Sequence, residues 1–133
     1  MSAYVDTSAL IAALDKSDSH HSLFAGLFSD PDRLITSSLV VAEGYAWFLK
    51  RYDRGKALQF LEFIEDLKVL TIESVGPEEI RGGSELIRKF SDQNLTLADS
   101  AGLWLMQRLK IKSCWSTDFH LGLAGVPLII HEK

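Results

Sequence analysis

The sequence predicts an α/β fold in which helices cover both faces of a mostly parallel sheet. Short apolar runs typical of buried strands alternate with longer segments in which apolar residues recur at helical spacing. This alternation favours parallel strands joined by helical crossovers. Right-handed crossovers would bring the carboxyl ends of the strands to one edge of the sheet. The length of 133 residues fits a single domain, 1–133, which can form a stable core without disulfides or structural metal ions.

In the first half of the chain, capping residues and turns mark where the elements begin and end. Ser19 is a candidate N-cap for a short helix that the Asp-Pro-Asp turn at 30–32 ends. Ser37 or Ser38 caps the next helix, and Gly55 separates that helix from a fourth. The expected elements are strands over 3–6 and 34–36 and helices over 7–16, 21–28, 38–52 and 56–67.

The second half continues the alternation. Pro77 followed by two glutamates suits a helix start, because proline is tolerated at the first position and acids favour the positive end of the helix dipole. We expect Gly82-Gly83 to weaken this helix. Thr96 begins the last long helix, and Gly125 precedes a final strand. The expected elements are strands over 69–72, 112–116 and 127–130, helices over 77–90 and 96–109, and a short helix or loop over 118–123.

The composition argues against disordered, secreted and membrane-spanning chains. Hydrophobic residues make up 47% of the chain, which is enough to form a core. No apolar run reaches the roughly 18 residues that span a membrane, and the N-terminus lacks the features of a signal peptide. The single Cys114 excludes an internal disulfide and fits a reducing cytoplasm, where we expect the protein to act. Its apolar strand predicts a buried, unreactive thiol.

Four carboxylates occupy places that this topology would gather. Asp6 and Asp118 follow expected strands, whereas Glu43 and Asp99 lie in the early turns of helices. In open α/β sheets the ligand crevice lies beyond the carboxyl ends of the strands. Acids that share such a site raise one another's pKa unless a counter-charge is present. A divalent cation supplies that charge, and all-oxygen ligands favour Mg²⁺ or Mn²⁺. The hypothesis is a metal-dependent hydrolase of phosphodiester bonds.

Each acid also has an ordinary structural explanation. Asp6 and Asp118 can cap the segments that follow them, and Asp99 with Thr96 is close to a capping box. Glu43 belongs to the inward-facing stripe of its helix, where a carboxylate is costly unless it is paired or binds a metal. It could instead reach water beyond the sheet edge. The metal site is favoured by the four acids together rather than by any one of them.

Positive charge is local in a chain whose net charge is −4. A negative net charge argues against a protein that coats nucleic acid non-specifically, but it is compatible with a nuclease whose acids gather at a metal site. Two basic clusters could hold phosphates, or they could simply stabilise helix ends and favour solubility. The 50–56 cluster consists of Lys50, Arg51, Arg54 and Lys56, and the 108–112 cluster consists of Arg108, Lys110 and Lys112.

Two helices are apolar nearly all round, those expected over 38–52 and 97–109. Such a pattern indicates either burial on several sides or an interface with a second copy or a partner. The residues concerned, beyond the inward stripe, are Val40, Val41, Tyr45, Trp47 and Phe48 in the first helix and Leu103, Trp104, Leu105 and Met106 in the second.

Four blocks of the sequence resemble the PIN-domain ribonucleases, especially the VapC-type toxins of toxin–antitoxin pairs. A lone Asp-Thr-Ser is a weak signal, but all four blocks in order are specific, and the resemblance spans essentially the whole chain. The blocks are Tyr4-Val5-Asp6-Thr7-Ser8-Ala9-Leu10, Ser37-Ser38-Leu39-Val40-Val41-Ala42-Glu43, Leu95-Thr96-Leu97-Ala98-Asp99-Ser100-Ala101 and Trp115-Ser116-Thr117-Asp118-Phe119-His120, followed by the turn at Gly125.

The resemblance implies a three-layer α/β/α sandwich with a central five-stranded parallel sheet. It also implies a Mg²⁺- or Mn²⁺-dependent endoribonuclease, a homodimer and inhibition by a small antitoxin. Phe119-His120 follows Asp118, where the family often has further acids, so whether the site holds one or two metal ions stays open. The implied metal ligands and catalytic acids are Asp6, Glu43, Asp99 and Asp118, with hydroxyls of Ser8 and of Ser116 or Thr117 orienting carboxylates or waters.

The expected reaction is in-line attack on the phosphate by a water that the metal activates. His120 could donate a proton to the leaving group or simply form hydrogen bonds, and His20, His21 and His131 look structural. Two other functions stay open. One is another phosphoryl-transfer enzyme, such as a phosphatase, although one such family has Asp-x-Asp where this chain has Asp6-Thr7-Ser8. The other is a catalytically weak module that binds a partner protein. The sequence does not identify the RNA or the antitoxin.

Overall fold

Residues 2–132 are described by a computed structural model of the chain. Helices and strands alternate along it as expected. In chain order the elements are β1 (Ser2–Val5), α1 (Thr7–Leu14), α2 (His21–Ser29), β2 (Arg33–Ser37), α3 (Ser38–Arg51), α4 (Arg54–Asp66), β3 (Leu70–Glu73), α5 (Pro77–Lys89), α6 (Leu97–Arg108), β4 (Cys114–Trp115) and the short 3₁₀-helices η1 (Phe119–Gly122) and η2 (Ile129–His131).

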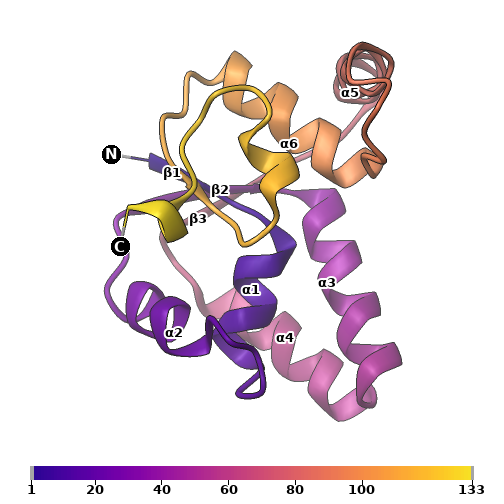
Figure 1. Ribbon diagram of the computed structural model, residues 1–133. Helices are drawn as coiled ribbons and strands as arrows, with labels where there is room; N and C mark the ends of the chain where they lie inside the picture. Colours follow the sequence, from indigo (N-terminus) through magenta and orange to yellow (C-terminus); the bar gives the residue numbers. More distant parts are fainter. Residues whose placement is uncertain (1, 133) are drawn as a thin grey trace.

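The sheet has the strand order β3-β2-β1-β4, and every pairing in it is parallel. β1 is an inner strand, and Tyr4 lies opposite Ile35 of β2 and Cys114 of β4. Because successive side chains of a strand point to opposite faces, Ala3 and Val5 join the core beneath α1–α4 while Tyr4 joins the core beneath α5 and α6. Figure 1 shows these two groups of helices on opposite sides of the sheet. The predicted α/β fold with helices on both faces is confirmed.

The prediction of a fifth strand over 127–130 is wrong. Leu128 forms a single parallel bridge with Cys114, and the chain then turns into η2. Pro127 accepts a hydrogen bond from the N–H of Cys114 at 3.2 Å, but proline has no N–H of its own to continue a ladder. Within residues 2–132 the sheet therefore has four strands, and β4 is shorter than the predicted 112–116. Cys114 is free and fully buried, as expected.

Caps explain where the helices begin. The Ser37 hydroxyl accepts the N–H of Val40 at 3.3 Å and caps α3, as predicted. α4 begins earlier than expected because Asp53 accepts the N–H of Lys56 at 2.9 Å. Ser19 is not the N-cap of α2; that position belongs to His20, whose N–H is bound by Asp18 at 2.8 Å. The Ser37 and Asp53 side chains each satisfy an N–H that the helix itself leaves unpaired, whereas the His20 side chain makes no such bond.

The glycine pair Gly82-Gly83 does not break α5. The two residues are buried where α5 packs against α6, and a Cβ at Gly82 would overlap the indole of Trp104. The pair thus allows two helices to approach closely. The space above Gly82 also explains where the Trp104 side chain packs, which is against the core of the chain and not exposed on α6.

Burial within the chain explains much of the apolar surface of α3 and α6. The expectation that the stripe containing Glu43 faces inward is wrong, since Ala42, Ala46 and Leu49 of that stripe are exposed. Leu103, Leu105 and Met106 are fully or almost fully buried, as are Val40 and Phe48. Val41, Tyr45 and Trp47 are partly buried and pack against the core beneath α1–α4. Within the part of the chain that the structure describes, no helix is long and apolar enough to cross a membrane.

Candidate active site

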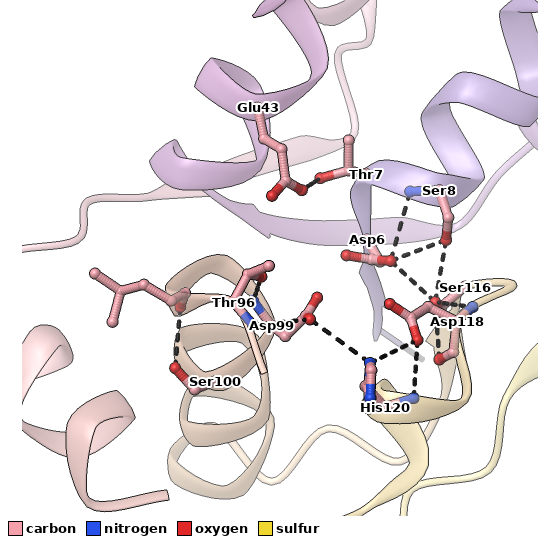
Figure 2. A network of polar contacts seen from close by, with 11 residues as sticks. Asp6, Thr7, Ser8, Glu43, Thr96, Asp99, Ser100, Ser116, Asp118 and His120 are labelled. Carbon is pink, nitrogen blue, oxygen red and sulfur yellow. Dashed lines mark hydrogen bonds and ion pairs between the residues drawn. The ribbon is translucent and has the colours of Figure 1, made fainter. Parts of the chain in front are cut away.

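A pocket of about 220 Å³ lies at the carboxyl edge of the sheet, and all four predicted acids line it. Asp6 follows β1, Glu43 lies in the second turn of α3, Asp99 in the first turn of α6, and Asp118 in the loop after β4. Figure 2 shows the four side chains converging from these elements. The full lining is Asp6, Thr7, Ser8, Ile11, Glu43, Trp47, Thr96, Asp99 and Asp118.

Asp6 is the most deeply buried of the acids, with 3% of its surface exposed. It is also the N-cap of α1, so the same side chain caps a helix and lines the pocket. Its Oδ2 atom accepts hydrogen bonds from the hydroxyls of Ser8 at 2.8 Å and Ser116 at 3.0 Å. Its other oxygen points into the space between Glu43 and Asp99 (Figure 2). The two hydroxyls therefore fix one oxygen and leave the other directed at the pocket.

The predicted hydroxyls form one connected network. The oxygens of Ser8 and Ser116 lie 3.1 Å apart, and Ser116 also accepts the N–H of Asp118 at 2.9 Å. Thr117 contacts this network through its backbone N–H, which donates to the Ser8 hydroxyl at 3.0 Å. The network joins α1 to the loop after β4 and so fixes Asp6 and Asp118 relative to each other.

Glu43 has a partner that the sequence did not reveal. The Thr7 hydroxyl donates a hydrogen bond to Oε1 of Glu43 at 2.5 Å across 36 residues of chain. Thr7 is buried, and its position directly after Asp6 at the start of α1 was the signal that could have identified it. Glu43 itself is partly buried. It neither packs in the core nor extends freely into water.

Asp99 is both a capping residue and a pocket residue. Its N–H donates to the Thr96 hydroxyl at 3.0 Å, and its Oδ2 accepts the N–H of Thr96 at 3.3 Å, which is a capping box. The carboxylate nevertheless faces the pocket (Figure 2). The reciprocal bonds hold the side chain in one orientation and so position its oxygens at the pocket wall.

Asp118 and His120 form a close pair beside Asp99. Asp118 Oδ1 accepts the backbone N–H of His120 at 3.0 Å and lies 3.1 Å from the ring atom Nδ1. Asp99 Oδ2 lies 3.9 Å from the same nitrogen. One ligand atom from each of the three residues lies within 4.8 Å of the others, a spacing that a metal ion could bridge. His120 is thus part of the site rather than a remote surface histidine.

The pocket is electrostatically unbalanced. Burial is the main cause that raises the pKa of Asp6, Glu43 and Asp99 above the usual carboxyl range, and hydrogen bonds partly oppose it. Neighbouring carboxylates raise the pKa further, as Asp118 does for Glu43 and Asp99. In the described part of the chain, the lining contains no lysine or arginine. A set of oxygen donors without a protein cation fits a divalent metal ion.

The basic clusters lie outside this pocket. The side chains of the 50–56 cluster are exposed, and Lys50 lies seven residues beyond Glu43 on α3, or about 10 Å along the helix axis. Arg108 pairs with Glu78 at 3.3 Å and lies over the ring of Trp104, so its role is at least partly structural. Lys110 and Lys112 line a separate cavity with Ser2. Phosphate binding by either cluster stays a prediction.

The fold and the pocket define an α/β protein whose carboxylates converge at the carboxyl edge of a parallel sheet, an arrangement suited to a divalent metal. Residues 3–121 match the family model of the PIN domain, and the chain belongs to this family. It is 27% identical over 115 residues to Ribonuclease VapC26 of Mycobacterium tuberculosis, covering 86% of this chain and 84% of the relative.

Solved structures of similar fold are toxins and toxin–antitoxin complexes. Mycobacterium tuberculosis VapC20, described as a Sarcin-Ricin loop cleaving toxin, matches with a TM-score of 0.84 and 20% identity, covering 93% of this chain and 95% of that chain. A toxin–antitoxin complex from Klebsiella pneumoniae matches with a TM-score of 0.63 and 17% identity, over 95% and 94% of the two chains. VapBC2 from Rickettsia felis, bound to a DNA fragment from its promoter, matches with a TM-score of 0.63 and 16% identity, over 96% and 97%.

Proposed function

We propose that this chain is a metal-dependent endoribonuclease that hydrolyses RNA phosphodiester bonds as the toxin of a toxin–antitoxin pair. The observation that carries the proposal is the convergence of Asp6, Glu43, Asp99 and Asp118 in one pocket of a PIN domain. Similarity to Ribonuclease VapC26 supports RNA as the substrate, and similarity to toxin–antitoxin complexes supports an antitoxin partner. The proposal includes a single domain, 1–133, that acts in the cytoplasm as a homodimer.

The acids would hold Mg²⁺ or Mn²⁺, since oxygen donors predominate among the pocket side chains. When bound, such an ion lowers the pKa of a coordinated water and offsets the charge of the phosphate. The protein's own contribution is to hold the four carboxylates in position. Hydroxyls of Ser8 and Ser116 fix Asp6, the Thr7 hydroxyl fixes Glu43, and backbone bonds fix the two remaining acids. Pre-oriented carboxylates need no rearrangement when substrate arrives.

Part of the pocket lining is apolar and suits a nucleotide. Ile11 and Trp47 line the same pocket as the carboxylates. A base can stack on an indole ring regardless of its identity, which holds the strand without reading its sequence. We propose that Trp47 contacts a base next to the cleaved phosphate. The 50–56 cluster at the far end of α3 would hold more distant phosphates.

The test is cleavage of defined RNAs by the purified protein with Mg²⁺, with Mn²⁺ and with a chelator, followed by mapping of the cut ends. The matched control is Asp6→Asn, which keeps the shape of the side chain and removes its charge. We expect cleavage only with metal, and a loss in Asp6→Asn larger than the roughly 10–100-fold typical of an outer partner of a metal ligand. Equal cleavage by both proteins would contradict the proposed site.

Two other outcomes would favour the alternative functions. Turnover of small phosphate esters without RNA cleavage indicates a different phosphoryl-transfer enzyme. Failure to bind a divalent ion, together with tight binding of a partner peptide, indicates a binding module.

A further inference from the structure

We propose that His120 is a nitrogen ligand of the metal ion, together with Asp99 and Asp118. Its imidazole would shift the preference of the site from Mg²⁺ towards Mn²⁺, because Mg²⁺ takes oxygen donors whereas the first-row transition ions, Mn²⁺ included, also accept nitrogen donors. The inference rests on the proposed function, since it assumes that the acid pocket holds a divalent ion. It adds a residue that the four-acid set does not contain and predicts which ion the site prefers.

The separations between the three ligand atoms fit one coordination sphere. Two donors at about 2.1 Å from an ion and at right angles to each other lie about 3 Å apart. Nδ1 of His120 lies 3.1 Å from Asp118 Oδ1, as adjacent ligands do. The 3.9 Å from Nδ1 to Asp99 Oδ2 fits a wider angle at the same ion. One ligand atom from each of the three residues lies within 4.8 Å of the other two.

The three side chains are held in place by the fold. The backbone N–H of His120 donates to Asp118 at 3.0 Å, so the single turn of η1 sets the spacing of this pair. Leu121, the next residue, is fully buried in the same core as Leu103 and Met106 of α6. That anchor holds η1 against the helix that carries Asp99. The arrangement exists before an ion arrives, which lowers the cost of binding one.

An ion can reach the three atoms from solvent. The side chain of Asp118 is 34% exposed and that of His120 is 19% exposed, whereas that of Asp99 is 8% exposed. The arrangement therefore has a buried side and an open side. The open side leaves room for water or a phosphate oxygen in the remaining coordination positions, as Mg²⁺ and Mn²⁺ sites require.

The competing explanation is an imidazolium ring that pairs with two carboxylates, or a proton donor to the leaving group. Both give the same short distances without an ion. They differ from the proposal in one measurable respect, because neither places the nitrogen in direct contact with the metal.

The experiment is pulsed EPR of the Mn²⁺-loaded full chain, with a titration of Mn²⁺ and Mg²⁺ affinity on the same samples. Direct coordination gives a nitrogen hyperfine coupling to Mn²⁺, and ¹⁵N-labelling of the histidines assigns it to imidazole. The variants are His120→Gln and His120→Asp, and the control is His131→Gln at an exposed position in η2. Circular dichroism establishes that each variant is folded.

We expect the coupling in the wild type and in His131→Gln and its loss in both His120 variants. His120→Gln should bind Mn²⁺ at least about tenfold more weakly, the lower end of the loss seen when even an outer partner is removed. His120→Asp restores an oxygen ligand, so it should bind an ion and shift the preference towards Mg²⁺. If Mn²⁺ binds the wild type without a nitrogen coupling, or the coupling survives in His120→Gln, the inference is overturned and the proposed function stands. If no ion binds the wild type, the proposed metal site fails and the inference with it.

Discussion

The hydroxyl of Thr7 donates a 2.5 Å hydrogen bond to Glu43, and this bond joins the start of α1 to α3 at the wall of the acid pocket. Glu43 has a longer and more flexible side chain than the aspartates, so ordering it costs more entropy. The Thr7 bond restricts it in the free protein. The metal affinity of the pocket should therefore depend on a residue that does not itself bind the ion.

Replacing Thr7 by valine should weaken metal binding while leaving the fold intact. Valine keeps the shape and removes the hydroxyl, and loss of such an outer partner costs roughly 10–100-fold in metal affinity or activity. Thr7→Ser keeps the hydroxyl and should rescue most of the loss. The measurement is a Mn²⁺ titration with RNA cleavage rates, and Thr71→Val on the exposed edge strand is the control. Unchanged metal affinity in Thr7→Val would show that the hydrogen bond from Thr7 to Glu43 does not contribute to metal binding.

The hydroxyls of Ser8 and Ser116 should act as a coupled pair. Ser116 is fully buried and accepts the N–H of Asp118, so Ser116→Ala leaves that N–H without its acceptor and should cost about 1–3 kcal/mol of stability. Both hydroxyls bind Asp6 and touch each other, which makes their contributions non-additive by about 0.5–3 kcal/mol. Urea unfolding of the two single variants and the double variant measures this coupling. Strict additivity would contradict the network.

The convergence of the four acids could be predicted because each occupies a position that chain order makes recognisable, the end of a strand or the first turns of a helix. Their roles as ligands stay a prediction. Asp6, Asp99 and Asp118 all cap or open helices, and the same backbone bonds that explain them structurally also direct them into the pocket. Thr7 and His120 were harder to find, because Glu43 and Asp99, the acids that they approach, lie on other elements. Periodicity carries no information about contacts between elements. The local signals are the position of Thr7 directly after Asp6 and that of His120 two residues after Asp118.

The last strand shows a similar limit. Apolar composition over 127–130 favoured a strand, but the outcome depended on Pro127 and on the short β4 beside it. Whether a segment pairs depends on its neighbour as much as on its own residues, because each ladder bond needs both a donor and an acceptor.

Stability away from the pocket should depend on pH through Asp15. Burial raises the pKa of Asp15, but hydrogen bonds from Ser17 and Tyr52 outweigh it and hold the pKa below the usual range. A depressed pKa adds stability that is present above the unfolded value near 3.9 and is lost as the pH falls through the folded value. Tyr52→Phe removes the 2.9 Å bond from the Tyr52 hydroxyl and should cost about 1 kcal/mol at pH 7.

The difference between wild type and Tyr52→Phe should shrink as the pH falls from about 4 through the depressed folded pKa of Asp15, because the carboxylate that accepts the bond is progressively protonated. Urea unfolding at a series of pH values measures it. Tyr45→Phe, in α3, whose C-cap is Tyr52, is the control and should show no such trend. A constant difference from pH 7 to pH 3 would exclude the Asp15 carboxylate as the cause.

Two glycines in helix interiors should respond oppositely to alanine. A Cβ at Gly82 would overlap the Trp104 indole, so Gly82→Ala should push α5 and α6 apart and cost about 1–3 kcal/mol. Gly26, in α2, has nothing within 4 Å of a Cβ, so Gly26→Ala should stabilise the chain by about 0.5–1 kcal/mol. Urea unfolding measures both. A stable Gly82→Ala protein would show that Trp104 can move aside at little cost.

Trp47 provides a test of how the pocket holds its substrate. Base stacking on an aromatic ring contributes about 1–3 kcal/mol, so Trp47→Ala should lower kcat/KM for RNA cleavage roughly 10- to 100-fold, mainly through KM. Trp47→Phe keeps a ring and should lose less. Leu49→Ala, at an exposed position on the same helix, is the control. Because Trp47 does not belong to the acid set, metal affinity should be unchanged in Trp47→Ala. A fall in kcat or in metal affinity without a change in KM would instead indicate that the ring supports the carboxylates, and base stacking at this position would be excluded.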